Sequence, residues 1–196
     1  MIGRVADWIN AGRIVVFPTR ALYGIGADIC QPDAVSRVFK IKRRSADKPI
    51  SVLIRFESQL NDLAAEVPDT ARRLMDRFWP GLITLVFTAH SAVPSALTGN
   101  SGKIGIRMPA HPVADALLAA LPHPITGTSA NLSGQPGCAR ISDLAAEIGK
   151  EMAMILDAGP LLGGAGSTVV DVTATPPIVL REGTVSEIDI RNCLKG

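Results

Sequence analysis

The sequence has few cysteines and no long apolar run. Its three cysteines, Cys30, Cys138 and Cys193, are far apart and form no C-x-x-C pair, which predicts neither a disulfide framework nor a zinc site. No segment approaches the ~18 uninterrupted apolar residues that a membrane span requires. Asp7 and Asn10 interrupt the N-terminal segment that could have formed the apolar part of a signal peptide. We therefore expect a cytoplasmic protein with reduced cysteines, no structural metal and no contact with a membrane.

The two commonest nucleotide-binding motifs are also missing. No G-x-G-x-x-G opens a helix after a predicted strand, and G-x-x-x-x-G-K-[ST] does not occur. The spacing of the residues indicates no Ser-His-Asp or Cys-His grouping, which disfavours covalent catalysis. His90, His111 and His123 are scattered and do not have metal-ligand spacing. Any phosphate site must therefore be built from other groups.

Length and composition are those of an ordinary globular protein. The chain has 196 residues, of which 47% are hydrophobic and 19% charged, so we expect a single domain over residues 1–196. The formal net charge of +2 gives no general argument for nucleic-acid binding. Aromatic residues make up only 4%, which leaves few stacking platforms for single-stranded RNA.

Apolar patterning predicts strands alternating with helices. Apolar runs predict strands over 14–17, 50–54, 83–87, 104–107, 125–128, 153–156, 168–172 and 178–181. Helical spacing or start signals predict helices near 5–9 and over 33–42, 68–78, 112–121, 142–150 and 188–194, with Ser142 as an N-cap. Residues 19–26 are expected to form a loop. The pattern predicts an α/β fold with one mixed, twisted sheet and helices packed around it.

A cluster of cations follows the second predicted helix. Residues 37–55 contain seven basic residues, among them Lys42, Arg43, Arg44 and Lys48, against the single acid Asp47. Arginine forks and lysine point charges suit phosphate oxygens. A solvated helix end would have the same composition, and both readings stay open at this point.

Three further features lie at predicted strand ends. A run of hydroxyls and one amide, which includes Ser129 and Asn131, follows the strand that begins at residue 125, where α/β sheets commonly bind ligands. A glycine-rich segment precedes Ser167. Arg107 and Arg181 each end an apolar strand and could bind a carboxylate or a phosphate. Plain turns and surface salt bridges are the alternatives.

Seven short segments, taken together and in order, are much more specific than any one of them. They are 18–24 (PTRALYG), 42–44 (KRR), 78–81 (FWPG), 105–107 (GIR), 129–134 (SANLSG), 167–171 (STVVD) and 180–183 (LREG). This series resembles the YrdC-like family of threonylcarbamoyl-AMP synthases, in its short single-domain form, over about residues 5–190. The resemblance implies a YrdC-like fold with a positively charged cleft.

The same resemblance implies an enzyme of the nucleotidyltransferase type. It would make L-threonylcarbamoyladenylate and pyrophosphate from L-threonine, bicarbonate or CO2, and ATP, with Mg²⁺ on the phosphates. A separate transferase complex would use this product to make threonylcarbamoyladenosine in tRNA, and any direct binding of tRNA would be weak. By family analogy, Lys42, Arg44 and Lys48 are expected to bind the ATP phosphates, with Lys42 and Arg44 catalytic. Asn131 and Arg181 are expected to help bind the nucleotide. Threonine binding is expected of Thr19, Arg107, Ser129 and Ser167.

The chain departs from the family pattern at three positions. Arg20 stands where an acid is common, Ser45 where proline commonly follows the K-x-R pair, and Glu182 where proline is frequent. These departures concern details of the pocket. The alternatives are a non-catalytic RNA-binding module of the same fold, and a carbamoyl-adenylate activity like that of hydrogenase-maturation carbamoyltransferases, which carry additional domains.

Overall fold

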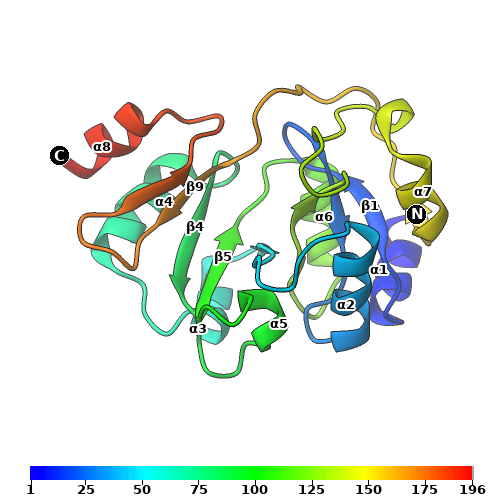
Figure 1. Cartoon of the computed structure of the whole chain (residues 1–196), viewed down its shortest axis with the longest axis horizontal. Helices are drawn as coiled ribbons and strands as arrows, with labels where there is room; N and C mark the ends of the chain where they lie inside the picture. Colours follow the sequence, from blue (N-terminus) through cyan, green and yellow to red (C-terminus); the bar gives the residue numbers. More distant parts are fainter. Residues whose placement is uncertain (196) are drawn as a thin grey trace.

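The computed structural model describes residues 1–195, so Gly196, the last residue of the expected 1–196 domain, lies outside the described residues. The α/β class with mixed parallel and antiparallel strands is confirmed. The strands form two sheets, however, where the apolar pattern predicted one. Figure 1 shows β4, β5 and β9 on one side of the molecule and β1 with α1, α2, α6 and α7 on the other.

The smaller sheet has four strands in the order β7-β2-β1-β8. Its centre is β1 (Val15–Pro18), which pairs antiparallel with β2 (Tyr23–Gly26) and parallel with β8 (Met154–Ile155). The short strand β7 (Thr128–Ser129) pairs antiparallel with β2. This sheet joins the beginning of the chain to segments more than a hundred residues later.

The larger sheet has six strands in the order β10-β9-β4-β5-β3-β6. The pairs β4–β9 and β3–β5 are parallel, and the other neighbours are antiparallel. The strands are β3 (Val52–Leu53), β4 (Ile83–Thr88), β5 (Lys103–Arg107), β6 (Ile125–Thr126), β9 (Thr168–Asp171) and β10 (Ile178–Arg181).

The described helices have ten residues or fewer, and none is long and apolar enough to cross a membrane. The α-helices are α1 (Ile2–Asn10), α2 (Pro32–Ile41), α3 (Leu60–Leu63), α4 (Asp69–Phe78), α5 (Ser95–Thr98), α6 (Pro112–Ala119), α7 (Ala146–Glu151) and α8 (Glu187–Lys195). Glu57–Gln59 and Ile141–Asp143 form short 3-10 turns. Proline at the first position of α2 and α6 is typical of a helix start, because its missing N–H would have no partner there.

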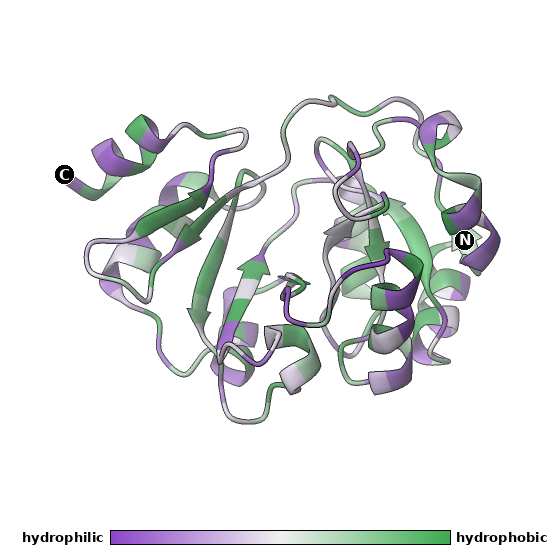
Figure 2. Ribbon diagram, in the orientation of Figure 1, coloured by the Kyte–Doolittle hydropathy of each residue, from purple (hydrophilic) through white to green (hydrophobic). Residues whose placement is uncertain are grey.

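The strand β1 is buried on both faces, which explains its uninterrupted apolar run. Val15 and Phe17 belong to a cluster formed with α1 and α6, whereas Val16 points into the larger core. Figure 2 shows that the strands of both sheets are predominantly hydrophobic, while polar residues lie mainly on the helices and loops. Burial of apolar side chains from both directions therefore fixes β1 as the centre of its sheet.

Two predictions about local structure are wrong. The helix expected from Ser142 begins at Ala146, because Leu144 and Ala145 have extended backbone, and the Ser142 hydroxyl instead bonds the Asp143 carboxylate at 3.2 Å. The expected loop 19–26 contains the buried strand β2. No side chain fits at Gly26 in that strand, because an added Cβ would lie 2.8 Å from the Phe17 ring. Glycine lowers strand propensity, so the sequence pattern did not indicate a strand at β2.

A close contact between two backbone segments supports the end of β10. A Cβ added to Gly183 would collide with the carbonyl oxygen of Gly166 and lie 2.7 Å from the Thr168 amide nitrogen. The Gly183 amide also donates a hydrogen bond of 3.0 Å to the Thr168 hydroxyl. Because backbone atoms cannot move away as a flexible side chain can, only glycine fits here.

We predict that Gly183→Ala lowers the free energy of unfolding by roughly 1–3 kcal/mol, the usual cost of overpacking. Gly3→Ala is the matched control, because no atom lies within 4 Å of a Cβ added at this position in α1. The control should leave stability unchanged or slightly increase it, since alanine is the better helix former. Urea unfolding followed by circular dichroism measures both, and equal stability of the two variants would contradict the close approach.

Candidate active site

The largest described cavity lies where the strand ends of the two sheets meet, and its volume is about 430 Å³. On the smaller sheet, Thr19 follows the end of β1, Tyr23 begins β2 and Ser129 ends β7. Because β2 is antiparallel to both of its neighbours, these three residues lie at the same edge. The volume is within the ~300–1,000 Å³ typical of small-molecule sites.

The larger sheet supplies the other wall in the same way. Arg107 ends β5 and Arg181 ends β10, whereas Thr84 lies at the start of β4 and Ser167 directly precedes β9. Since β5 and β10 run antiparallel to β4 and β9, these four residues share one edge of the sheet. Residues separated by almost a hundred positions therefore face one cavity.

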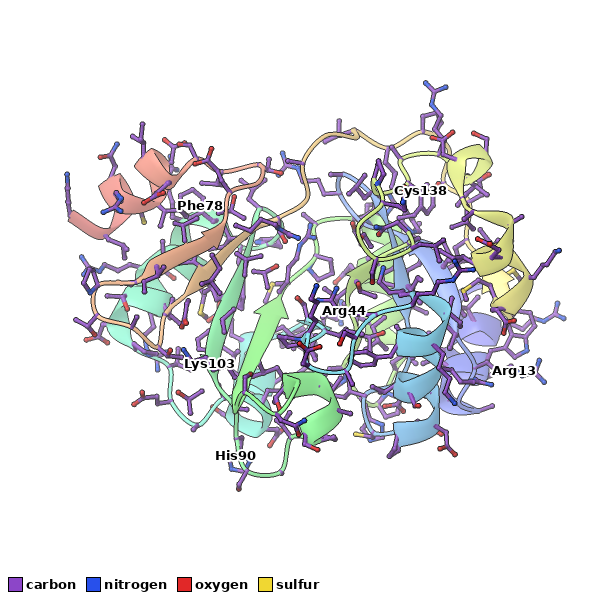
Figure 3. The ribbon with its side chains drawn as sticks, in the orientation of Figure 1. Arg13, Arg44, Phe78, His90, Lys103 and Cys138 are labelled. Carbon is purple, nitrogen blue, oxygen red and sulfur yellow. The ribbon has the colours of Figure 1, made fainter. Side chains whose placement is uncertain are left out.

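The cavity has a strongly positive lining. Lys42, Arg44, Arg107 and Arg181 line it, and no aspartate or glutamate is among the described lining residues. Figure 3 shows Arg44 near the middle of the molecule, between β5 and α2. Four cations thus line one cavity, and no described carboxylate lines it with them.

Lys42 is the most deeply buried of these cations, with only 1% of its surface exposed. It directly follows α2, and its Nζ donates to the carbonyl oxygens of Ser129 at 2.5 Å and Asn131 at 2.7 Å, with Asn131 Oδ1 at 3.4 Å. Burial, together with the charge of Arg44, lowers the pKa of Lys42 to about 8. The ammonium group therefore fixes the Ser129–Asn131 loop from the inside.

The Asn131 side chain completes the same loop. Its Nδ2 donates to the carbonyl oxygens of Leu132 at 2.8 Å and Gln135 at 2.6 Å, and its Oδ1 accepts a hydrogen bond from the Ser129 hydroxyl. All the polar groups of this amide are engaged within the loop. Asn131 thus contributes to the cavity mainly by holding the loop that forms this part of its wall.

Arg44 presents its guanidinium group to the cavity. Its Nε donates to the carbonyl oxygen of Lys48 at 3.1 Å and its Nη2 to that of Pro49 at 2.8 Å. Burial, followed by the charge of Arg181, lowers the pKa of Arg44. The two carbonyls hold one side of the fork, and Nη1 has no bond to a described residue. Arg44 is consequently suited to bind an anion.

Arg107 is held in a comparable way. Its Nε donates to the carbonyl oxygen of Gly81 at 2.9 Å, which leaves both Nη groups for other partners. Burial, with further contributions from the charges of Arg181 and Arg20, lowers the pKa of Arg107 to about 10. An anion bound between these arginines would offset the repulsion that adds to the effect of burial on this pKa.

Ser167 connects both Thr84 and Arg181 to the cavity wall. The Ser167 hydroxyl lies 2.7 Å from the Thr84 hydroxyl, and the Ser167 carbonyl accepts a 2.8 Å hydrogen bond from Arg181 Nη2. On the opposite wall, the Thr19 hydroxyl donates to the Leu22 carbonyl at 2.6 Å. Both walls therefore present polar groups in fixed positions.

Eight of the nine residues expected at the site line this cavity, and Lys48 does not. Lys48 is exposed, and its backbone carbonyl, rather than its ammonium group, contributes to the site by orienting Arg44. Sequence reasoning missed Thr84 and placed Tyr23 only within a motif. A polar residue inside the otherwise apolar run 83–87 was the signal that could have indicated Thr84.

A known protein family matches most of the chain. A family model named for Sua5, YciO and YrdC and described as "Telomere recombination" matches residues 7–183. Proteins named threonylcarbamoyl-AMP synthase are similar to the chain: that of Pyrococcus abyssi is 40% identical over 91% of the chain, and that of Bacillus subtilis is 37% identical over 96%. The chain spans 52% and 55% of these two relatives, about half their length.

Solved structures agree in fold. The crystal structure of P. abyssi Sua5 complexed with L-threonine superposes with a TM-score of 0.93 and 38% identity, and the match covers 98% of this chain and 56% of the other. With a family model that matches residues 7–183 and relatives that share this fold and about 40% of their residues, the chain belongs to the Sua5/YciO/YrdC family.

Proposed function

We propose that the chain is an L-threonylcarbamoyladenylate synthase that uses L-threonine, bicarbonate or CO2, and ATP. The amine of threonine adds to CO2 and loses a proton to give a carbamate, whose oxygen attacks the α-phosphorus of ATP, and pyrophosphate leaves with the electrons of the broken P–O bond. The observation that carries this proposal is a cavity lined by four cations and no carboxylate. Such a lining favours the attack of one anion on another, because cations lower the repulsion between them.

The two walls suit the two substrates. Arg44, on the wall formed after α2, presents Nη1 for phosphate oxygens. Arg107, on the larger sheet, presents both Nη groups and is suited to a bidentate pair with the threonine carboxylate. Ser129 ends β7 and Ser167 directly precedes β9, and both hydroxyl groups can form hydrogen bonds with the amino acid. Positioning and charge stabilisation would then account for catalysis without a protein nucleophile.

Mg²⁺ would enter as part of Mg·ATP rather than as a cofactor held by the protein. The described lining offers serine, threonine and asparagine oxygens but no carboxylate, whereas protein Mg²⁺ sites generally use one or two carboxylates. The residues present therefore do not form a magnesium site of their own, and the protein's cations act on the phosphates directly.

We propose a cytoplasmic location, and we propose that a separate transferase complex takes up the adenylate for the modification of tRNA. The four cations line a cavity rather than an exposed stripe, which favours a small anionic substrate over a nucleic-acid backbone. Adenylate formation without tRNA separates this function from a non-catalytic RNA-binding module. Nanomolar binding of tRNA at about 0.2 M salt, with no pyrophosphate released from ATP, would favour the module, because phosphate contacts weaken steeply with salt.

We predict that Arg44→Met lowers the rate of pyrophosphate release on the order of 10²-fold, or ~3 kcal/mol of transition-state stabilisation. Lys48→Met is the matched control, since it removes a neighbouring positive charge that does not line the cavity, and it should retain most of the activity. Pyrophosphate release in the presence of ATP, bicarbonate, Mg²⁺ and L-threonine measures both. Equal losses in the two variants would mean that net charge, rather than the Arg44 contact, matters.

We predict that ATP binding weakens as the pH rises through the pKa of Lys42. The folded-state pKa of about 8 lies below the ordinary value, so the ammonium group is charged below this pH and loses its proton above it. If only the charged form binds, affinity should fall by about five-fold between pH 8 and pH 9. Titration calorimetry measures the affinity for ATP at each pH. Lys42→Met should bind ATP weakly with no such slope, and a slope that persists in this variant would assign the titration to another group.

We predict that Arg107→Met raises the KM for threonine by about 10–100-fold, because the carboxylate loses a bidentate charged partner. The affinity for ATP should change little. Arg13→Met, which removes an exposed arginine distant from the cavity, is the control. Serine should be a poorer substrate by only ~1–3 kcal/mol, the value of one methyl group. An unchanged threonine KM in Arg107→Met would place the carboxylate elsewhere.

A further inference from the structure

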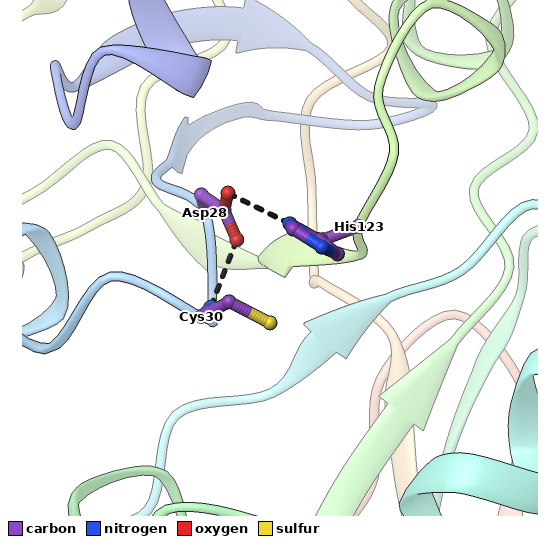
Figure 4. A group of neighbouring side chains, drawn as sticks. All are labelled: Asp28, Cys30 and His123. Atoms are coloured by element: carbon purple, nitrogen blue, oxygen red, sulfur yellow. Dashed lines mark hydrogen bonds and ion pairs between the residues drawn. The ribbon is translucent and has the colours of Figure 1, made fainter.

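A second group of polar side chains lies at the end of β2 that is remote from the cavity. β2 begins at Tyr23, which lines the cavity, and ends at Gly26; Asp28 and Cys30 follow beyond that end. His123 precedes β6 and faces them. Figure 4 shows the three side chains gathered at one place. Among residues 1–195, this is the one group of three or more histidine, cysteine or acidic side chains whose ligand atoms converge, all within 4.8 Å of one another.

The distances within this group suit a small divalent cation. His123 Nδ1 lies 3.1 Å from Asp28 Oδ2. Two ligands that are each about 2.0–2.1 Å from a tetrahedral ion lie roughly 3.3 Å apart, so this pair already has the separation of two ligands on one ion. The Cys30 sulfur completes a set of three, because it lies within 4.8 Å of the other two ligand atoms, and the residue is exposed.

The backbone holds the three residues in place before any ion binds. Asp28 Oδ1 accepts a 2.8 Å hydrogen bond from the Cys30 amide, which fixes the turn between them. Asp28 forms an antiparallel bridge with Ile125, and the Ile29 amide donates to the Pro124 carbonyl at 3.3 Å. Asp28 itself is 4% exposed, and its carboxylate is oriented toward the other two ligands. Preorganised ligands lower the entropy cost of binding a metal.

We propose that Asp28, Cys30 and His123 bind one zinc-class divalent cation, with the fourth coordination position open to solvent. The chemistry of the ligands selects the class: sulfur and imidazole nitrogen favour zinc or cobalt over calcium or magnesium, which prefer oxygen. A carboxylate, a thiolate and a neutral imidazole together balance the two positive charges of the ion. The wide separation of Cys30 and His123 in the sequence explains why residue spacing gave no indication of such a site.

The position of the site gives it a structural consequence. β2 belongs to the smaller sheet and β6 to the larger, and Thr126 joins them: its amide donates to the Ala27 carbonyl at 2.8 Å, and its hydroxyl accepts from the Ala27 amide at 3.0 Å. A cation held by Asp28 and Cys30 on one side and His123 on the other would cross-link the two sheets at this junction. Because the three ligands do not line the cavity, metal binding can be measured separately from the proposed synthase activity.

Binding of Co²⁺ and Zn²⁺ to the full-length, reduced protein tests the proposal. Co²⁺ should give one equivalent of a thiolate charge-transfer band with the visible bands of a tetrahedral ion, and Zn²⁺ should displace it. Cys193→Ser, which removes another accessible thiol, should keep these bands. Cys30→Ser should lose the charge-transfer band, and His123→Gln should weaken binding while keeping sulfur ligation.

Thermal unfolding gives a second readout. Free Zn²⁺ at about 100 times the measured Kd should raise Tm by roughly 5–10 °C in the wild type and in Cys193→Ser but not in Cys30→Ser. The absence of a thiolate band in the wild type would overturn the proposal. A thiolate band that persists in Cys30→Ser or is lost in Cys193→Ser would also overturn it. So would a metal affinity in His123→Gln that equals the affinity of the wild type. Metal-free Tm values verify that each variant folds.

Discussion

The site depends on one buried positive charge. Lys42 places an ammonium group against the backbone carbonyls of Ser129 and Asn131, with 1% of the residue exposed. Only a protonated amine can donate three hydrogen bonds, so the loop geometry and the charge are linked. Removing the proton would take a donor from the loop and a cation from the cavity at the same time. The residue that shapes the pocket is thus also part of its electrostatics.

The remaining cations are held by backbone carbonyls rather than by acids. Lys48 and Pro49 provide the carbonyls for Arg44, Gly81 for Arg107 and Ser167 for Arg181. A carbonyl orients a guanidinium group without cancelling its charge, whereas a carboxylate would neutralise it. The cost is burial of the charged groups and, to a smaller extent, repulsion between neighbouring arginines, and both lower the pKa values of Arg44 and Arg107. An anionic substrate offsets this repulsion when it binds, which makes the site selective for negative charge.

Much of this arrangement could be predicted from the sequence, and the remainder has physical reasons. The strand ends at Arg107 and Arg181 were visible because each arginine terminates an apolar run. The division of the strands into two sheets could not be predicted from the sequence. Strands such as β3 and β7 have only two residues each, and tertiary contacts decide how they pair. Lys48 could not be distinguished from Arg44, since composition does not say whether a residue contributes its side chain or its carbonyl.

The two sheets are joined at one end and separated at the other. At Thr126, three hydrogen bonds to Ala27 and Ile25 connect them, and three residues later the same chain ends β7 at Ser129, in the cavity wall. The segment 126–129 is therefore short and fixed at both ends, by Thr126 at the junction and by the Lys42 ammonium at the cavity. The hydrogen bonds of the junction and the cavity wall at Ser129 therefore belong to one short segment. The position of this wall consequently depends on the junction as well as on the Lys42 ammonium group.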